Sequence, residues 1–136
     1  MIRYGKMVQT AVAVTSRLAE TYGKDDIVTS SLDIAQSRHL PKPNVAKVLT
    51  VLAKHKLVTG APGPGGGYRL AKPPQSISLF DIVEIFEKQS DVQPCPLGPN
   101  WCGNGPKCAF HDKFLALKEK NEHFLKSTNF GAFRDR

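Results

Sequence analysis

The sequence contains no long apolar run. Nowhere in its 136 residues does a stretch approach the roughly 20 apolar residues of a membrane-spanning helix, and the first residues do not resemble a signal peptide. It also contains no internal repeat and no low-complexity tract. These absences lead us to expect a small cytoplasmic protein, built as one domain or as a small domain with an extension.

Signatures of enzymes are missing as well. A dithiol oxidoreductase commonly carries a C-x-x-C pair with a base beside it, and the cysteine segment has neither. Paired carboxylates are also absent there. The glycine-rich GPGGGY has neither the Gly-Lys-Ser/Thr ending of a phosphate-binding loop nor a following helix pattern. We therefore expect a protein that is not an enzyme.

The chain does contain a cluster of cysteines. Its only three, Cys95, Cys102 and Cys108, lie in CPLGPNWCGNGPKCAFH, and His111 follows the last by three positions. Cysteine is often buried as a small hydrophobic residue, but a loop this rich in glycine and proline cannot form a regular core element. A disulfide would leave one thiol over, and clustered unpaired thiols fit a reducing compartment. We therefore expect this segment to bind a metal or an iron–sulfur cluster.

The spacing of the cysteines favours one kind of centre. Most structural zinc sites pair cysteines two to four residues apart, whereas six and then five residues separate these three. Iron–sulfur clusters are held mostly by thiolates, with histidine sometimes replacing cysteine on one iron. An iron–sulfur cluster is therefore favoured, and its nuclearity, [2Fe–2S] or [4Fe–4S], stays open. A zinc-stabilised protein and a plain thiol switch are the alternatives.

Excess positive charge is confined to the first half of the chain. Residues 1–72 contain 11 Lys or Arg and 4 Asp or Glu, and residues 73–136 contain 8 of each, so the net charge of +7 falls entirely on the first half. A basic half beside a neutral one suggests a module that binds a polyanion, joined to a module with another task. A merely soluble surface explains the charge equally well, so the pattern along the chain has to decide.

The first half begins with the pattern of two helices. Residues 7–22 place apolar side chains on one helical face, and Gly23 ends that pattern. A second helix follows Ser30, with Asp33 as a capping partner three residues on. Leu32 and Ala35 are expected to point inward.

A third helix and a hairpin complete the pattern. The helix begins near Pro43, which suits a first turn because its missing N–H is not needed there. Its apolar face consists of Val45, Val48, Leu49 and Leu52. Two short strands, LVTGA and YRLAK, follow on either side of PGPGGGY, a turn that needs a nearly bare backbone. This order predicts a winged helix, and the two short helices joined by a tight turn predict a helix-turn-helix that binds DNA.

The second half contains two further helix patterns, one on each side of the cysteines. ISLFDIVEIFEK is amphipathic, and Ser78 can cap its start. AFHDKFLALKEKNEHFLKS is a long helix with an apolar stripe that has one polar member. We call this set the α-helical stripe: Phe110, Phe114, Leu117, Asn121 and Phe124. Spacings of four and three residues are those of a coiled coil, and also those of a helix packed on its own core.

Several of these segments carry a family resemblance. LPKPNVAKVLTVLAKHKLV, then GPGGGYRLAKPPQSISLFDIVE, then a three-cysteine loop and the ending FLKSTNFGAF resemble the IscR/NsrR/RirA family of bacterial winged-helix iron–sulfur transcription regulators. The resemblance implies a mostly α fold with a small β-wing. It assigns residues 1–75 to a winged helix-turn-helix domain, and residues 76–136 to a helix, a cluster loop and a dimerisation helix. It also implies a homodimer on a pseudo-palindromic operator in double-stranded DNA.

The resemblance further implies a ligand set. Cys95, Cys102 and Cys108 match the cluster thiolates, and His111 matches the fourth ligand of IscR-like members. NsrR-like members use an acidic residue near the N-terminus of the partner subunit. The corresponding stretch here, GKMVQTAV, offers Gln9 and no carboxylate. This departure favours His111.

DNA contacts are implied by position as well. The start of the third helix would face base edges through Lys42, Pro43, Asn44, Ala46 and Lys47. Phosphate contacts would come from Ser30, Ser31 and the wing glycines Gly65, Gly66 and Gly67, and the DNA-binding set also includes Tyr68 and Arg69. Pro62 departs from the family, because many members place an arginine there; for minor-groove reading by the wing, Arg69 is the nearby arginine.

These expectations combine into one function. We expect a transcriptional regulator, more commonly a repressor in this family, whose operator affinity is controlled by an iron–sulfur cluster. The cluster would sense redox state, nitric oxide or iron and cluster status. The α-helical stripe would pair with the first helix of the partner subunit.

Overall fold

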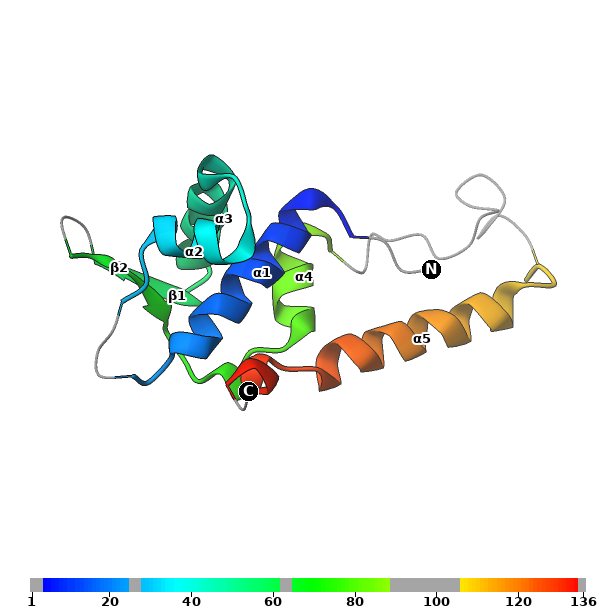
Figure 1. Ribbon diagram of the computed structural model, residues 1–136. Coiled ribbons are helices and arrows are strands. Elements are labelled where there is room, and N and C mark those ends of the chain that lie inside the picture. Colours follow the sequence, from blue (N-terminus) through cyan, green and yellow to red (C-terminus); the bar gives the residue numbers. More distant parts are fainter. Residues whose placement is uncertain (1–3, 25–27, 62–64, 89–105, 135–136) are drawn as a thin grey trace.

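The computed structural model describes residues 4–24, 28–61, 65–88 and 106–134 (Figure 1). Within these ranges the chain is mostly helical, with one small antiparallel sheet of two strands. The elements follow one another in this order: α1 Lys6–Thr21, α2 Ser31–Arg38, α3 Lys42–Lys54, β1 Val58–Ala61, β2 Gly67–Leu70, the 3-10 helix η1 Pro74–Ser76, α4 Leu79–Phe86, α5 His111–Ser127 and the 3-10 helix η3 Phe130–Phe133. The predicted fold class, mostly α with a small wing, is confirmed.

Helix α1 lies at the centre of the molecule. It packs against α2 and α3 on one side and against α4 and η3 on the other, as Figure 1 shows. Ala11, Val14, Leu18 and Ala19 are buried along it, at the helical spacing that the sequence indicates. The helix ends at Thr21, and Gly23 just beyond it has a φ of +74°. Both halves of the chain thus bury apolar surface on the same helix.

Helices α2 and α3 form the predicted helix-turn-helix. The Ser30 hydroxyl accepts a hydrogen bond from the Asp33 N–H at 3.0 Å, which confirms the predicted cap. His39 turns the chain in the left-handed region, with a φ of +55°, a conformation in which histidine is enriched. Helix α3 has Pro43 in its first turn and buries the four apolar residues that its pattern predicts.

One expectation about α2 is wrong. Leu32 was expected to point inward, but its side chain is 49% exposed, whereas Ile34 is fully buried and Ala35 nearly so. Successive residues are rotated by about 100° around a helix, so Leu32 lies on the side of α2 opposite Ile34. The inward face of this short helix consists of Ile34 and Ala35.

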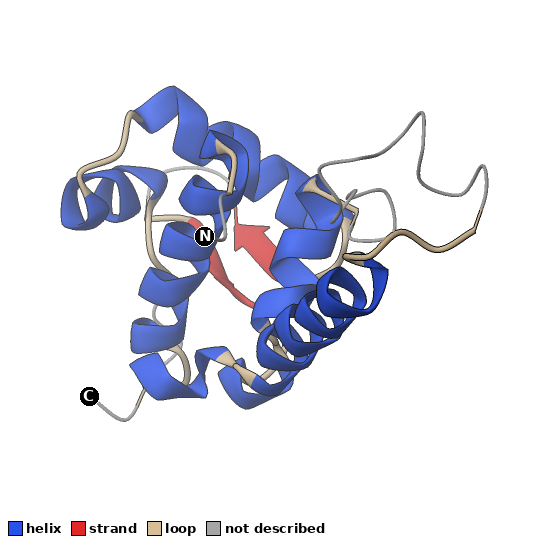
Figure 2. Ribbon diagram, turned by 90° about the vertical axis from the view of Figure 1, so that its right-hand side faces the viewer, coloured by secondary structure: helices blue, strands red, loops and turns tan. Residues whose placement is uncertain are grey.

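The wing follows α3. Strands β1 and β2 pair antiparallel, with Val58 opposite Leu70 and Ala61 opposite Gly67. An isolated bridge adds a further connection: the Thr29 N–H donates to the Tyr68 carbonyl at 2.9 Å, and the Tyr68 N–H donates to the Thr29 carbonyl at 2.8 Å. The wing is therefore bonded to the residue that precedes the cap of α2. Figure 2 shows the two strands between helices.

The second half packs back onto the first. Ser78 and Asp81 form a capping box at the start of α4, which confirms Ser78 as its cap. Ser78 also bridges to Asn129, just before η3. Ile77, Ile82 and Phe130 enter the main core together with residues of α1 and α3. The division at residues 75 and 76 stays a prediction, and the main core draws on both sides of it.

A second, smaller core lies near the start of α1. It consists of Val8 from α1, Val83 from α4 and Leu125 from α5, all three almost fully buried. Leu125 is the buried residue of α5, and the first turns of that helix extend away from the body of the molecule (Figure 1). Among the described residues, no helix is long and apolar enough to span a membrane.

Candidate nucleic-acid interface and cysteine segment

The outer face of α3 carries the residues predicted to contact bases. Lys42, Pro43, Asn44, Ala46 and Lys47 are all exposed, whereas Val45 between them is fully buried. Burial of the apolar face therefore presents these five side chains together on the surface. Lysine and asparagine can hydrogen-bond guanine and adenine edges in a major groove, and a helix of this diameter fits that groove.

The start of α2 and the wing lie close to each other because of the Thr29–Tyr68 bridge. Ser30 is exposed and Ser31 half-buried, both in the first turn of α2, where backbone N–H groups favour an anion. Gly65 has a φ of +76°, which favours glycine, and Arg69 is exposed on β2. Pro62, Gly63 and Pro64 lie outside the described residues.

Gly67 allows the close approach between the wing and α2. A Cβ added at this position would lie 2.7 Å from the Thr29 carbonyl oxygen and 3.1 Å from the Ser30 nitrogen. Both are backbone atoms, so neither can rotate away. Gly67, the last glycine of GPGGGY, is therefore required by packing against the start of α2, a reason that the sequence alone did not reveal.

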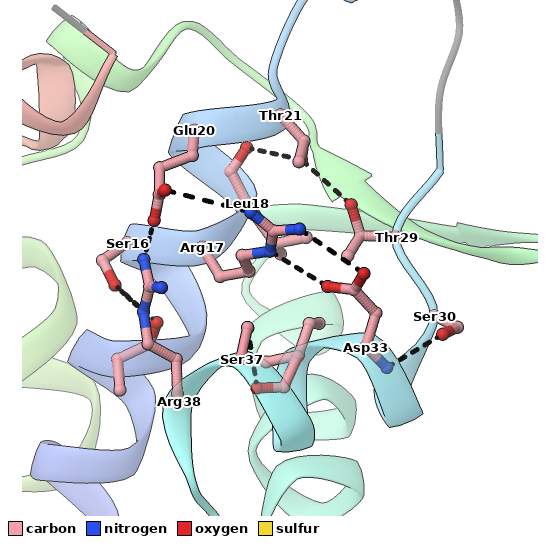
Figure 3. A network of polar contacts seen from close by, with 12 residues as sticks. Ser16, Arg17, Leu18, Glu20, Thr21, Thr29, Ser30, Asp33, Ser37 and Arg38 are labelled. Carbon is pink, nitrogen blue, oxygen red and sulfur yellow. Dashed lines mark hydrogen bonds and ion pairs between the residues drawn. The ribbon is translucent and has the colours of Figure 1, made fainter. Parts of the chain in front are cut away.

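Sequence reasoning missed a network of charged side chains between α1 and α2, drawn in Figure 3. Arg17 donates from Nε and Nη2 to the two carboxylate oxygens of Asp33, at 2.9 and 3.4 Å. Arg17 also lies 3.9 Å from Glu20, whose carboxylate pairs with Arg38, and Arg38 Nε donates to Ser16 at 3.1 Å. The network thus reaches both ends of α2. Asp33 was recognised only as a capping partner.

The cysteine segment is described only at its end. Cys95 and Cys102 lie outside the described residues. Cys108 is a half-buried free thiol, and the N–H of His111 donates to its carbonyl oxygen at 3.1 Å. His111 is the first residue of α5 and is half-buried too. Within the described part of the chain, no group of three potential metal ligands comes together.

The start of α1 contacts the residue that follows α4. Glu87 Oε1 accepts a hydrogen bond from the Gly5 N–H at 2.7 Å. No acidic residue lies in the first turn of α1, so Glu87 supplies the negative charge that this helix terminus favours. Burial raises the pKa of the Tyr4 hydroxyl, and the Glu87 carboxylate adds to that effect. This end of α1 is therefore tied to the chain just before the cysteine segment.

Most of the α-helical stripe is exposed on α5. Phe110, Leu117 and Phe124 are 50%, 58% and 49% exposed. Asn121 Oδ1 is buried and has no hydrogen-bond partner among the described residues. Large exposed apolar side chains in a row are typical of an interaction surface.

Comparison with known proteins identifies the family. The family model Rrf2, an iron-dependent transcriptional regulator, matches residues 4–135. The chain belongs to the Rrf2 family. A protein of Aquifex aeolicus described as an HTH-type transcriptional regulator is 36% identical over 98 residues, which cover 71% of this chain and 68% of the relative. IscR of Klebsiella pneumoniae (strain 342) is 28% identical over 119 residues, which cover 88% of this chain and 72% of the relative.

Solved structures agree on the fold. CymR, the global cysteine regulator of B. subtilis, has a TM-score of 0.82 at 21% identity, and the match covers 99% of this chain and 98% of the CymR chain. IscR of T. potens has a TM-score of 0.77 at 22% identity, and the match covers 98% of this chain and 88% of the IscR chain. The expected family resemblance is confirmed, and so is the expectation that the protein is not an enzyme. It is an Rrf2-family transcriptional regulator that binds DNA.

Gly67→Ala tests the close approach of the wing to α2. The added methyl group forces the wing away from Thr29, and we expect the free energy of unfolding to fall by roughly 1–3 kcal/mol, the usual cost of overpacking. Urea titration followed by circular dichroism measures it. The control is Gly65→Asn, which adds its side chain to open space in a conformation that asparagine tolerates. Equal stability of Gly67→Ala and wild type would contradict the packing argument.

Proposed function

We propose that this Rrf2 protein is a homodimeric regulator whose operator affinity is set by an iron–sulfur cluster bound to Cys95, Cys102, Cys108 and His111. The observation that carries the proposal is that Cys108, a half-buried free thiol, and the half-buried His111 lie three residues apart where α5 begins, joined by a backbone hydrogen bond. The IscR relatives and the family's iron-dependent description support it.

The donor set fits such a cluster. Three thiolates and one neutral imidazole are ligands that iron–sulfur clusters accept. Gln9, which occupies the region from which NsrR-like members supply their acidic ligand, is engaged elsewhere, because its Nε2 donates to the Tyr4 carbonyl at 2.9 Å. His111 is therefore the favoured fourth ligand. When bound, the cluster supplies a centre sensitive to oxidants, nitric oxide and iron supply.

A small core offers a physical connection from the cysteine segment to the DNA-binding half. Helix α4 leads into the segment and α5 leads out of it, and both contact α1 through Val8, Val83 and Leu125. Glu87 adds a hydrogen bond to the first turn of α1. A change in the distance between the end of α4 and the start of α5 therefore acts on α1, which packs directly on α2 and α3.

The thiol switch is the second candidate function, since Cys108 is a free, half-buried thiol. The crystal structure of the oxidized form of Staphylococcus aureus CymR resembles this chain with a TM-score of 0.77 at 18% identity. A likeness at this identity concerns the fold alone. Metal and sulfide content separates the two candidates.

Lys47→Ala tests the base-reading face of α3. Removal of a guanine contact should weaken binding to the operator by about 1–3 kcal/mol while binding to random duplex falls less. The measurement is a fluorescence anisotropy titration at fixed salt on the promoter of the protein's own gene. Lys113→Ala, which removes an exposed lysine from α5, is the matched control. Unchanged operator affinity of Lys47→Ala would refute this contact.

Anaerobic purification tests the cluster. We expect non-haem iron and acid-labile sulfide in the wild type, and loss of both in Cys108→Ser, because serine replaces a thiolate ligand. Promoter titrations of the cluster-bound and cluster-free protein should then give different affinities. Zinc without sulfide would favour the zinc-stabilised protein, and a redox response without metal would favour the thiol switch. Equal promoter affinities of the cluster-bound and cluster-free protein would refute the sensing proposal.

Leu117→Lys tests the α-helical stripe as the dimer surface. A charge placed in a buried apolar seam destabilises association, so we expect sedimentation equilibrium to show a shift from dimer to monomer. Leu115→Lys is the matched control, because Leu115 is also exposed, at 42%, yet lies two residues away on another side of α5. Dimers of unchanged stability for Leu117→Lys would place the interface elsewhere.

A further inference from the structure

The first turn of α2 contains an electrostatic conflict. Asp33 lies there, three residues after Ser30, and its side chain is 46% exposed. Ser30 and Ser31, on the same turn, are the residues proposed to contact phosphates. A carboxylate at this place repels a nearby polyanion, and the repulsion weakens DNA binding unless the charge is neutralised.

The same carboxylate stabilises α2. This helix has eight residues and buries only Ile34 and Ala35, so it has little apolar contact to hold it. A negative charge in the first turn compensates the positive end of the helix dipole. Asp33 therefore supports the helix while it opposes the ligand that the helix is proposed to meet.

Arg17 lies where it can resolve this conflict. Its guanidinium comes from α1, outside the helix-turn-helix, and binds both carboxylate oxygens of Asp33, at 2.9 and 3.4 Å (Figure 3). The Arg17 side chain is 25% exposed, so the pair is partly shielded from water. A two-point guanidinium–carboxylate pair is among the stronger charge-assisted contacts.

The other acidic residue of the network has a cation of its own. Glu20 lies 3.9 Å from Arg17, but its carboxylate makes its hydrogen bond with Arg38, at the last turn of α2. Arg38 also donates to Ser16 at 3.1 Å, which holds it beside Glu20. The two closest pairs are thus Arg17 with Asp33 and Arg38 with Glu20. Arg17 therefore directs two N–H donors of its guanidinium to the Asp33 carboxylate.

We propose that Arg17 acts as a charge-masking residue, which neutralises Asp33 so that the first turn of α2 can approach a DNA phosphate. This inference rests on the proposed placement of α2 against the phosphate backbone. It assigns a role in DNA affinity to a side chain that belongs to neither the helix-turn-helix nor the wing. The phosphate-facing turn then keeps its stabilising acid without presenting a net negative charge.

The Arg17–Asp33 pair could instead affect binding only by holding α2 in place, an alternative that we call bracing. Arg17→Ala should weaken DNA binding under either explanation, whereas Asp33→Asn should change the affinity in opposite directions under the two. Asp33→Asn removes the repulsion and releases the Arg17 cation beside the phosphate, so masking predicts affinity at least as high as that of the wild type. Bracing predicts weaker binding, because the ion pair is lost in that variant as well.

The experiment measures binding of the full-length protein to two labelled duplexes at one fixed salt concentration. One duplex spans the promoter of the protein's own gene, and the other has a random sequence of the same length. We expect Arg17→Ala to weaken promoter binding about tenfold, equivalent to roughly 1.4 kcal/mol. The double variant Arg17→Ala/Asp33→Asn should return to within about threefold of the wild type, because no charge remains to be masked.

Arg17→Lys is the conservative variant. It keeps the positive charge and loses the planar fork, so masking predicts that it retains most of the affinity. Circular dichroism and thermal unfolding of each variant report whether it folds. If Arg17→Ala does not fold, the sign of the Asp33→Asn effect still decides the question.

The inference is overturned by a loss of affinity in Asp33→Asn, and equally by a double variant that binds as weakly as Arg17→Ala. Lys47→Ala, measured on the same duplexes, tests the proposed DNA interface independently of Arg17. If it weakens promoter binding while the Arg17 variants behave like the wild type, charge masking fails and the interface stands. If none of these variants changes binding, the placement of the interface fails as well.

Discussion

Burial of apolar surface on two sides of α1 is the constraint on which the rest of the structure depends. Val14 and Leu18 contribute to the core that holds α2, α3 and the wing, and Val8 contributes to the smaller core shared with α4 and α5. Because side chains in a core are closely packed, a displacement of the elements in either core also displaces side chains of α1. The winged helix-turn-helix and the helices that flank the cysteine segment are thereby packed on one shared element.

The DNA-binding half adds polar contacts where apolar burial is small. Helix α2 buries two residues, and its position is fixed as well by the cap at Ser30, the bridge from Thr29 to Tyr68 and the pairs with α1. Thr21 and Thr29 add a hydroxyl contact at 2.9 Å. Helix α2 is therefore held in place by backbone hydrogen bonds, the close contact at Gly67 and ion pairs. Helix α3 is held in place by its larger apolar face.

Local signals were sufficient for much of this fold. The apolar spacing of α3, the cap at Ser78 and the pairing of the two strands that flank the glycine-rich segment each depend on residues a few positions apart, and the structure confirms them. Leu32 was misplaced because two neighbouring apolar positions compete for one inward face in a helix of only eight residues. Short helices contain too few turns for periodicity to separate such alternatives.

Contacts between distant residues had no signal in a single sequence. Gly5 and Glu87 are 82 positions apart, and nothing in either segment indicates the other. The pair of Arg17 with Asp33 is likewise set by how α1 and α2 cross. The cluster ligands and the base contacts stay predictions, because two of the three cysteines lie outside the described residues and recognition depends on a partner molecule.

Helix α5 has one further consequence. It is 17 residues long, yet Leu125 near its end is the residue that it buries within its own chain. Isolated helices of this length are marginal in water, so in the proposed dimer the partner's surface also supports the helical order of its first turns. On that proposal, dilution unwinds α5 from its first turns while the winged domain remains folded.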